Sequence, residues 1–256
     1  MTLMCTAQCA PYIPLAAVPA LLWLLFFTSQ KVHREKIRNI LYIFFWGIFI
    51  AAPVVVVQAL IEDILYTPFA SYALASTLYA FLGIAFVEEA GKYLVVKLKA
   101  VPRAFFDEPQ DAIIYMITAG LGFAAIENMV YAAGIASSLR EVIELAAFRG
   151  ITATFLHASA SAVLGYFLAI SIFDRTSEHK KFIFIGLTGA TVLHGIYNNF
   201  IMNITDIVQQ FECTPFGEQG CPESLFGVTL IALLLISSGI IITVGLHKLT
   251  KIQFNN

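Results

Sequence analysis

Long apolar runs recur along the whole chain, separated by short segments that hold most of its charges. A helix needs roughly 20 residues to cross a hydrocarbon layer of about 30 Å, and each run is about that long. The runs are continuously apolar, whereas the strands of a membrane barrel are shorter and alternate. The pattern predicts an all-α, polytopic transmembrane helix bundle of about seven or eight spans. We place seven of them, at 10–28, 40–61, 70–96, 111–134, 148–173, 182–202 and 225–247.

The composition supports an integral membrane protein. Hydrophobic residues make up 59% of the chain and charged residues only 12%, which is outside the balance of a water-soluble domain. No internal repeat, low-complexity tract or long linker divides the sequence, so we expect a single membrane domain over 1–256 in contact with the lipid bilayer. The net charge of -2 gives no reason to expect a nucleic-acid partner.

The distribution of lysine and arginine predicts the orientation, because short loops rich in these residues stay in the cytoplasm. With seven spans, only Arg140 and Arg149 fall on one side, and Lys92 lies within the membrane. We therefore expect the N-terminus outside and the C-terminus in the cytoplasm. The basic residues on the cytoplasmic side are Lys31, Arg34, Lys36, Arg38, Lys97, Lys99, Arg103, Arg175, Lys180, Lys181, Lys248 and Lys251.

The four cysteines fall on segments that this orientation places outside. Cys5 and Cys9 lie in the N-terminal tail, and Cys213 and Cys221 lie in the 203–224 loop. A disulfide between Cys213 and Cys221 is permitted there, and four free thiols are an equal alternative.

Polar residues cluster in four successive spans, although an ionisable group at mid-helix costs at least about 2.5 kcal/mol. Such residues are expected to face the bundle interior and to have partners, and together they describe a site with its core at 81–200. Taken singly, the pair Glu88 and Lys92 could be a structural ion pair, and each histidine a packing residue. The set comprises Glu88, Glu89, Lys92, Glu127, Asn128, His157, His194, Asn198 and Asn199.

These residue types favour hydrolysis by an activated water. Two adjacent carboxylates at low dielectric do not both ionise cheaply, and Lys92 is expected to keep one of them charged. A charged Glu88 or Glu89 is a candidate general base, while a histidine and the Asn198 amide are candidates for stabilising the oxyanion. The sequence contains neither G-x-S-x-G nor H-E-x-x-H, so no serine nucleophile or contiguous zinc motif is indicated.

A metal site is a second possibility within the same set. Glu127, His157 and His194 supply one oxygen and two nitrogens, a ligand set of catalytic zinc sites that leaves a fourth position for water. We favour zinc slightly, since two histidines and a third carboxylate exceed what a simple glutamate mechanism needs. In the metal-free alternative Glu88 activates water alone and the histidines steady the intermediate.

Five ordered segments resemble the PrsW family of intramembrane proteases over residues 81–200. Glu88-Glu89-Ala-Gly-Lys92 is similar to the family's EExxK signature, and Phe123-Ala-Ala-Ile-Glu127 to its FxxxE signature. FDEPQDAIIY at 106–115, RGITATFLH at 149–157 and HGIYNNF at 194–200 also resemble family segments in order and spacing.

The resemblance implies a protease with Glu88 and Glu89 as an essential acidic pair and with His157 and His194 as essential histidines. It implies a single-span membrane protein as substrate, an anti-sigma factor in the best-known case, and the plasma membrane of a prokaryote as location. The family motif usually has aspartate four residues after the histidine. This chain has Asn198 there, as the related type II CAAX prenyl endopeptidases do.

Two alternatives stay open at this stage. A CAAX-type prenyl-protein endopeptidase would use the same chemistry, although FxxxE replaces the FxxxH of that group. A proton-coupled transporter would also contain intramembrane Glu, Lys and His, but usually shows internal repeats. One difficulty concerns depth, because Glu88 and Glu127 lie at different distances from the cytoplasmic ends of their spans. If they meet, a helix must tilt or break, and Gly120 and Gly122 are the expected place.

Overall fold

The computed structural model describes residues 10–29, 35–66, 72–174 and 178–210, together with Ile236, Gly239, Ile240 and Val244. All regular structure in these residues is helical, which confirms the all-α prediction. η1 is a 3-10 helix and η2 is a π-helix. In chain order the elements are η1 (Ala10–Ala17), α1 (Val18–Ser29), α2 (Ile37–Tyr66), α3 (Tyr72–Leu78), η2 (Tyr79–Phe86), α4 (Val87–Lys99), α5 (Pro109–Ile135), α6 (Leu139–Ile151), α7 (Ala153–Phe173) and α8 (His179–Gln210).

Five helical segments are long and apolar enough to cross a membrane, and they correspond to the first five predicted spans. The membrane-spanning helix bundle is therefore confirmed, but the count of seven is not. The sixth predicted span, 182–202, lies within α8, which is not among the five, and the seventh, 225–247, lies mostly outside the described residues. All four cysteines lie outside them as well. The five segments are Ala10–Ser29, Ile37–Leu65, Leu74–Lys99, Pro109–Ile135 and Leu139–Phe173.

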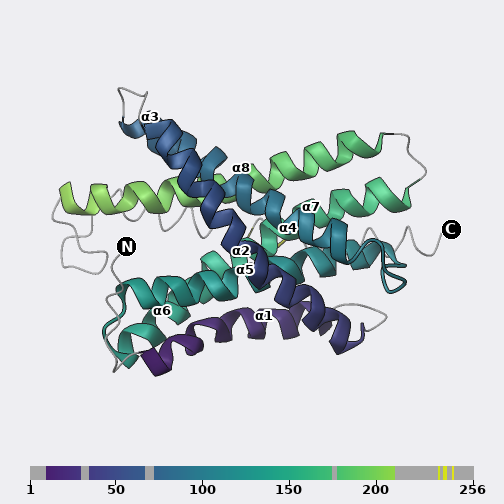
Figure 1. Ribbon diagram of the computed structural model, residues 1–256, viewed down its shortest axis with the longest axis horizontal. Coiled ribbons are helices and arrows are strands. Elements are labelled where there is room, and N and C mark those ends of the chain that lie inside the picture. The colour runs from purple at the N-terminus through teal and green to yellow at the C-terminus, as the bar shows by residue number, and fades with distance from the viewer. Residues whose placement is uncertain are drawn as a thin grey trace.

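α5 lies at the centre of the bundle, where it packs against α7, α2, α1 and η1. Figure 1 shows α2 crossing in front of α5, with α7 and α8 side by side. Every side chain from Pro109 to Ala125 is buried, as expected for a helix that is apolar on all faces. Asp111 fixes the start of the helix, because its Oδ2 accepts hydrogen bonds from the backbone N–H groups of Glu108 (2.7 Å) and Asp107 (2.9 Å).

Glycines allow α5 to approach its neighbours at backbone distance. A Cβ added to Gly122 would lie 2.1 Å from the carbonyl oxygen of Phe44 on α2, and one added to Gly120 would lie 2.3 Å from Ser161 Oγ on α7. α5 runs unbroken through both positions, so the expected break is not there. The two glycines instead permit close helix packing.

The irregular backbone lies in the two neighbouring segments. The third span changes from α3 to the π-helix η2 at Tyr79, and η2 ends at Phe86, two residues before Glu88. π-helical turns are frequent at functional sites. The predicted span 148–173 is divided between α6 and α7 at Thr152, which has φ -97° and ψ -85°. The Thr152 hydroxyl donates to the Phe148 carbonyl at 2.9 Å, a local bond that competes with regular helix.

Candidate active site

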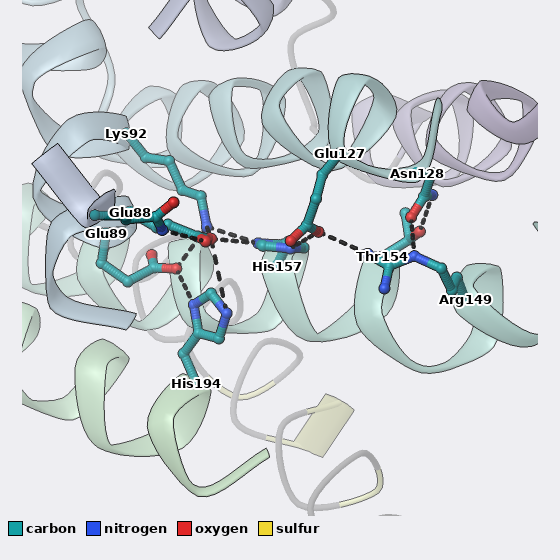
Figure 2. A network of polar contacts seen from close by, with 10 residues as sticks. Glu88, Glu89, Lys92, Glu127, Asn128, Arg149, Thr154, His157 and His194 are labelled. Carbon is teal, nitrogen blue, oxygen red and sulfur yellow. Dashed lines mark hydrogen bonds and ion pairs between the residues drawn. The ribbon is translucent and has the colours of Figure 1, made fainter. Parts of the chain in front are cut away.

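Ionisable side chains from four helices meet inside the bundle, as Figure 2 shows. Glu88, Glu89 and Lys92 come from α4, His157 comes from α7 and His194 from α8. All five are at most 2% exposed. Glu127 on α5 reaches the same cluster through His157. The structure thus brings together the ionisable residues that the sequence places on the third to sixth predicted spans.

Lys92 holds this cluster together through several contacts of its ammonium group. Nζ lies 2.6 Å from Glu89 Oε1 and 2.7 Å from His157 Nδ1, and 3.7 Å from Glu88 Oε2. Nζ also lies 4.8 Å from the centre of the Phe123 ring, which is itself buried. Phe123, the first residue of the FxxxE segment, therefore lies against the charged cluster.

The two bonds of His157 define which ring nitrogen carries the proton. An ammonium group can only donate, so Nδ1 accepts from Lys92. Nε2 then carries the proton and donates to Glu127 Oε2 at 2.9 Å. The Glu127 carboxylate therefore fixes the orientation of the ring and leaves the Nδ1 lone pair facing the centre of the cluster.

His194 is held in the same way by a different carboxylate. Its Nδ1 lies 2.9 Å from Glu89 Oε1, and because a carboxylate accepts, Nδ1 carries the proton. Nε2 is left with a lone pair and lies 3.8 Å from Glu88 Oε2. Each histidine thus has one nitrogen bonded to a carboxylate and the other directed toward Glu88.

Glu88 is the third carboxylate, and its Oε2 faces both histidines. This oxygen lies 3.9 Å from His157 Nδ1, which, like the distance to His194, is too long for a hydrogen bond. No hydrogen bond reaches it from the described residues. The ligand atoms of Glu88, His157 and His194 all lie within 4.8 Å of one another, and one carboxylate with two imidazoles suits a catalytic zinc ion. The residues present therefore fit a metal.

Glu127 is anchored on its other side by a second polar chain that sequence reasoning did not assemble. Arg149 on α6 donates from Nη2 to Glu127 Oε2 (2.7 Å) and from Nε to Asn128 Oδ1 (2.7 Å). Asn128 Nδ2 in turn donates to Thr154 Oγ1 at 2.9 Å. The Arg149 guanidinium also lies 3.9 Å from the centre of the Tyr131 ring. The chain of bonds fixes the carboxylate that orients His157.

Two further residues differ from the sequence-based expectation. Gln58 on α2 donates from Nε2 to Glu88 Oε1 at 3.0 Å, although the second span was expected to contribute almost no polar group. A glutamine directly after the valines at 54–57 was the available signal. Asn198, one turn after His194, is half-buried, and among the described residues no hydrogen bond joins its side chain to the cluster.

Comparison with known proteins identifies the family of the chain. Residues 35–236 match the family described as PrsW family intramembrane metalloprotease. The chain belongs to this family. Protease PrsW of Bacillus subtilis (strain 168) is 27% identical over 173 residues, which cover 68% of this chain and 74% of that protein. Protease PrsW of Shouchella clausii (strain KSM-K16) is 29% identical over 192 residues, covering 73% and 81%.

No solved structure matches the chain. Protease PrsW of Clostridioides difficile (strain 630) is 25% identical over 191 residues, or 73% of this chain and 78% of that protein. The PrsW resemblance of the sequence motifs is thus confirmed, and the chain is an intramembrane protease, a hydrolase of a metalloprotease family. The prenyl endopeptidase and transporter hypotheses are not favoured.

Two arginines of α6 form Arg–Glu pairs, Arg149 with Glu127 on α5 and Arg140 with Glu144 on α6, and the pairs predict contrasting responses to substitution. Arg149–Glu127 and Arg140–Glu144 have the same 2.7 Å separation, but their side chains are 12% and 23% exposed in the first pair and 86% and 60% in the second. Arg149→Met removes the donor to Asn128 Oδ1 and one of the two donors to Glu127 Oε2, so we expect a loss of about 1–3 kcal/mol of stability. Arg140→Met should cause no measurable change, because solvent screens an exposed pair.

Thermal unfolding of the two purified variants in the same detergent measures this contrast. Arg149→Lys is a further arm, since it should recover part of the loss by keeping one charged donor near Glu127. Equal unfolding temperatures for the Arg149→Met and Arg140→Met variants would show that the chain from Arg149 to His157 does not stabilise the fold.

Proposed function

We propose that this protein hydrolyses a peptide bond of a single-span membrane protein at a metal held by Glu88, His157 and His194. The observation that carries the proposal is the paired arrangement of the histidines. Each ring has its outer nitrogen held by a carboxylate and its inner nitrogen directed toward Glu88. Carboxylates behind metal-binding histidines orient the rings and raise their basicity, and such partners are usual in metal sites.

The proposed ligand set differs from the set expected from sequence in one residue. Glu127 was expected as the third ligand, but its Oε2 is engaged by His157 Nε2 and Arg149. Glu88 Oε2 instead faces the inner nitrogens of both rings. Lys92 donates to His157 Nδ1, so binding of a metal requires Lys92 to give up that bond and keep Glu89. When bound, zinc would supply Lewis acidity that polarises the scissile carbonyl and favours ionisation of water.

Glu89 is proposed as the base that accepts the proton of the attacking water. Its Oε1 is engaged by Lys92 and His194, while its Oε2 has no hydrogen-bond partner among the described residues. The water oxygen bonds to the carbonyl carbon, and its proton passes to Glu89. As the carbon–nitrogen bond breaks, Glu89 returns the proton to the leaving nitrogen. Lys92 remains beside Glu89 as the countercharge.

Asn198 is proposed as a donor to the carbonyl oxygen of the substrate. Its amide makes no hydrogen bond in the described part of the chain, and it lies one helical turn from His194. An amide donor directed at a developing oxyanion is a common means of lowering the barrier to acyl transfer. This role keeps the assignment made from the sequence.

The site's surroundings support a substrate that arrives within the membrane. The catalytic side chains are buried among helices of membrane-spanning length, so a soluble chain has no direct approach through water. A single-span protein can reach such a site by diffusing in the bilayer. The family resemblance adds an anti-sigma factor as the kind of protein to be expected.

The first prediction concerns the metal. Elemental analysis of purified wild-type protein should find about one zinc ion per chain, as in catalytic zinc sites with three protein ligands. Glu88→Gln, His157→Ala and His194→Ala should lose it. Glu127→Gln should still bind the metal, but with an affinity about 10- to 100-fold lower. The substitution changes only the hydrogen-bond partner of His157 Nε2 and removes no metal ligand.

Two outcomes would contradict this assignment. Full zinc in Glu88→Gln with none in Glu127→Gln would restore Glu127 as the ligand, as the sequence suggested. An active wild-type protein without bound metal, or full activity in a chelator, would favour the metal-free mechanism in which a glutamate alone activates water.

The second prediction concerns the reaction. In membranes of cells making the wild-type protein, a single-span protein should appear as fragments with a new end inside its apolar segment, and it should stay intact with Glu89→Gln. In proteoliposomes the variant should lose at least about a hundredfold in rate while retaining its metal, since a general base contributes on that scale. Glu144→Gln, at an exposed position on α6, is the matched control. A search of membrane proteins that finds no such fragment would reject the proposed function.

The third prediction concerns orientation in what we propose is the plasma membrane of a prokaryote. The excess of basic residues on one side places the N-terminus outside and the C-terminus in the cytoplasm. With the native cysteines replaced by serine, Ser137→Cys before α6 should react with a membrane-impermeant thiol reagent added to intact cells. Glu178→Cys before α8 should react only after lysis. Both positions are exposed, and the opposite labelling pattern would invert the topology.

A further inference from the structure

α2 and α5 touch at backbone distance at one level of the bundle. A Cβ added to Gly47 on α2 would lie 2.3 Å from the Ala119 carbonyl oxygen, and one added to Gly122 on α5 would lie 2.1 Å from the Phe44 carbonyl oxygen. A side chain at either position would therefore separate the helices. The two glycines define the point where this pair of helices is closest packed.

Beyond this crossing, on the C-terminal side in both helices, a groove of about 360 Å³ lies between them. One face of each helix lines it, at the spacing of three and four residues that defines a helix face. η2 and the start of α4 form the third wall, with Tyr79, Ile84 and Glu88. The lining residues of the two long helices are Ala51, Val55 and Gln58 on α2, and Phe123, Ile126, Glu127, Val130 and Tyr131 on α5.

The π-helix shapes the third wall of the groove. A Cβ added to Gly83 would lie 2.3 Å from the Tyr79 ring, so the absence of a side chain at Gly83 lets this ring lie flat against η2. The Tyr79 hydroxyl lies 3.4 Å from Glu62 Oε2 on α2. Tyr79 therefore connects η2 to α2 along the edge of the groove.

The groove connects the lipid-facing surface with the catalytic cluster. Val55 and Val130 are 59% and 53% exposed on helices of membrane-spanning length, so the open side is apolar. Glu88 and Glu127 line the same groove, and Gln58 reaches from its wall to Glu88 Oε1. An apolar opening that leads to carboxylates suits a peptide segment whose side chains are apolar and whose backbone is polar.

We propose that this groove receives an extended, apolar segment of the substrate laterally from the lipid; this inference rests on the proposed protease function. A scissile peptide bond within a helix is shielded by its own hydrogen bonds, so the segment must unwind before it reaches Glu88. Unwound backbone in lipid costs several kcal/mol for each unpaired group. Gln58 and Tyr131 are groove-lining residues with polar side-chain groups that can pair with such a backbone. Segments that contain glycine, which disfavours helix, would unwind most easily.

Adjacent positions on α2 provide a matched test. Val55 lines the groove and Val56 does not, yet they are 59% and 60% exposed. The substrate for this test is the membrane protein that wild type cleaves and that stays intact with Glu89→Gln. Val55→Trp should fill the groove and lower kcat/KM for this substrate by at least about tenfold, mainly by raising KM, because a bulky side chain occupies the binding space. Val56→Trp should leave the rate close to that of wild type.

α5 offers a second matched pair, Val130 in the groove and Ile135 outside it, which are 53% and 52% exposed. Val130→Trp should impair cleavage and Ile135→Trp should not. Metal content and thermal unfolding should match wild type in all four variants, so that a loss of rate reports on binding. In a Glu88→Gln background, a photoreactive benzoylphenylalanine at position 55 should cross-link the intact substrate, and one at position 56 should not.

The outcomes separate this inference from the proposed function. If wild type cleaves the membrane protein but the Val55 and Val56 variants cleave and cross-link alike, the groove is not the binding site and the protease function stands. If wild type cleaves no membrane protein, the proposed function itself fails. Loss of cleavage at positions 55 and 130 alone, with cross-linking at position 55, supports lateral entry through the groove.

Discussion

Removing an ammonium group or a carboxylate from water costs several kcal/mol per ion, and this cost governs how the polar centre of the bundle is built. Lys92 is fully buried, and its ammonium group is compensated by Glu89 Oε1, His157 Nδ1 and the face of Phe123. Glu88 adds a second carboxylate at 3.7 Å. Glu88 and Glu89 of the EExxK segment and Phe123 of the FxxxE segment thus all contact Lys92, and each contact reduces the free-energy cost of burying its ammonium group.

The same contacts decide the chemistry that the cluster can perform. Since Lys92 can only donate, it sets the tautomer of His157, and Glu89 sets that of His194. Glu127 holds the outer nitrogen of His157 and is itself held by Arg149. The inner nitrogens of both rings face Glu88 Oε2, and that of His157 also accepts from Lys92. A network that satisfies buried charge therefore also produces a site with the donor set of a metalloprotease.

The sequence predicts which helices carry the residues of the site. It predicts less well which atoms of those residues are in contact. Ionisable residues within apolar spans are rare, because placing them in a membrane costs free energy, so the sequence reveals the ionisable residues of the site, of which Glu88 is the first and His194 the last. Helical spacing favoured a pairing of Lys92 with Glu88, whereas the closer contact is with Glu89, because the side chains meet His157 and His194 from other helices. Contacts of Gln58 and Arg149 depend on tertiary packing, and the break at Thr152 on local backbone geometry. Neither has a periodic signal in the sequence.

An intramembrane protease must satisfy two opposing demands. Its charged groups must be shielded from water so that their electrostatic interactions with the transition state are strong, and its substrate must still reach them from the lipid. Glu88 meets both demands through its two oxygens, because Oε1 accepts from Gln58 in the groove wall and Oε2 faces the histidine nitrogens. The position of Glu88 in turn depends on η2, which ends immediately before α4. The glycine crossing of α2 and α5 closes one end of the groove beside the buried cluster, and the exposed Val55 and Val130 lie on its open side.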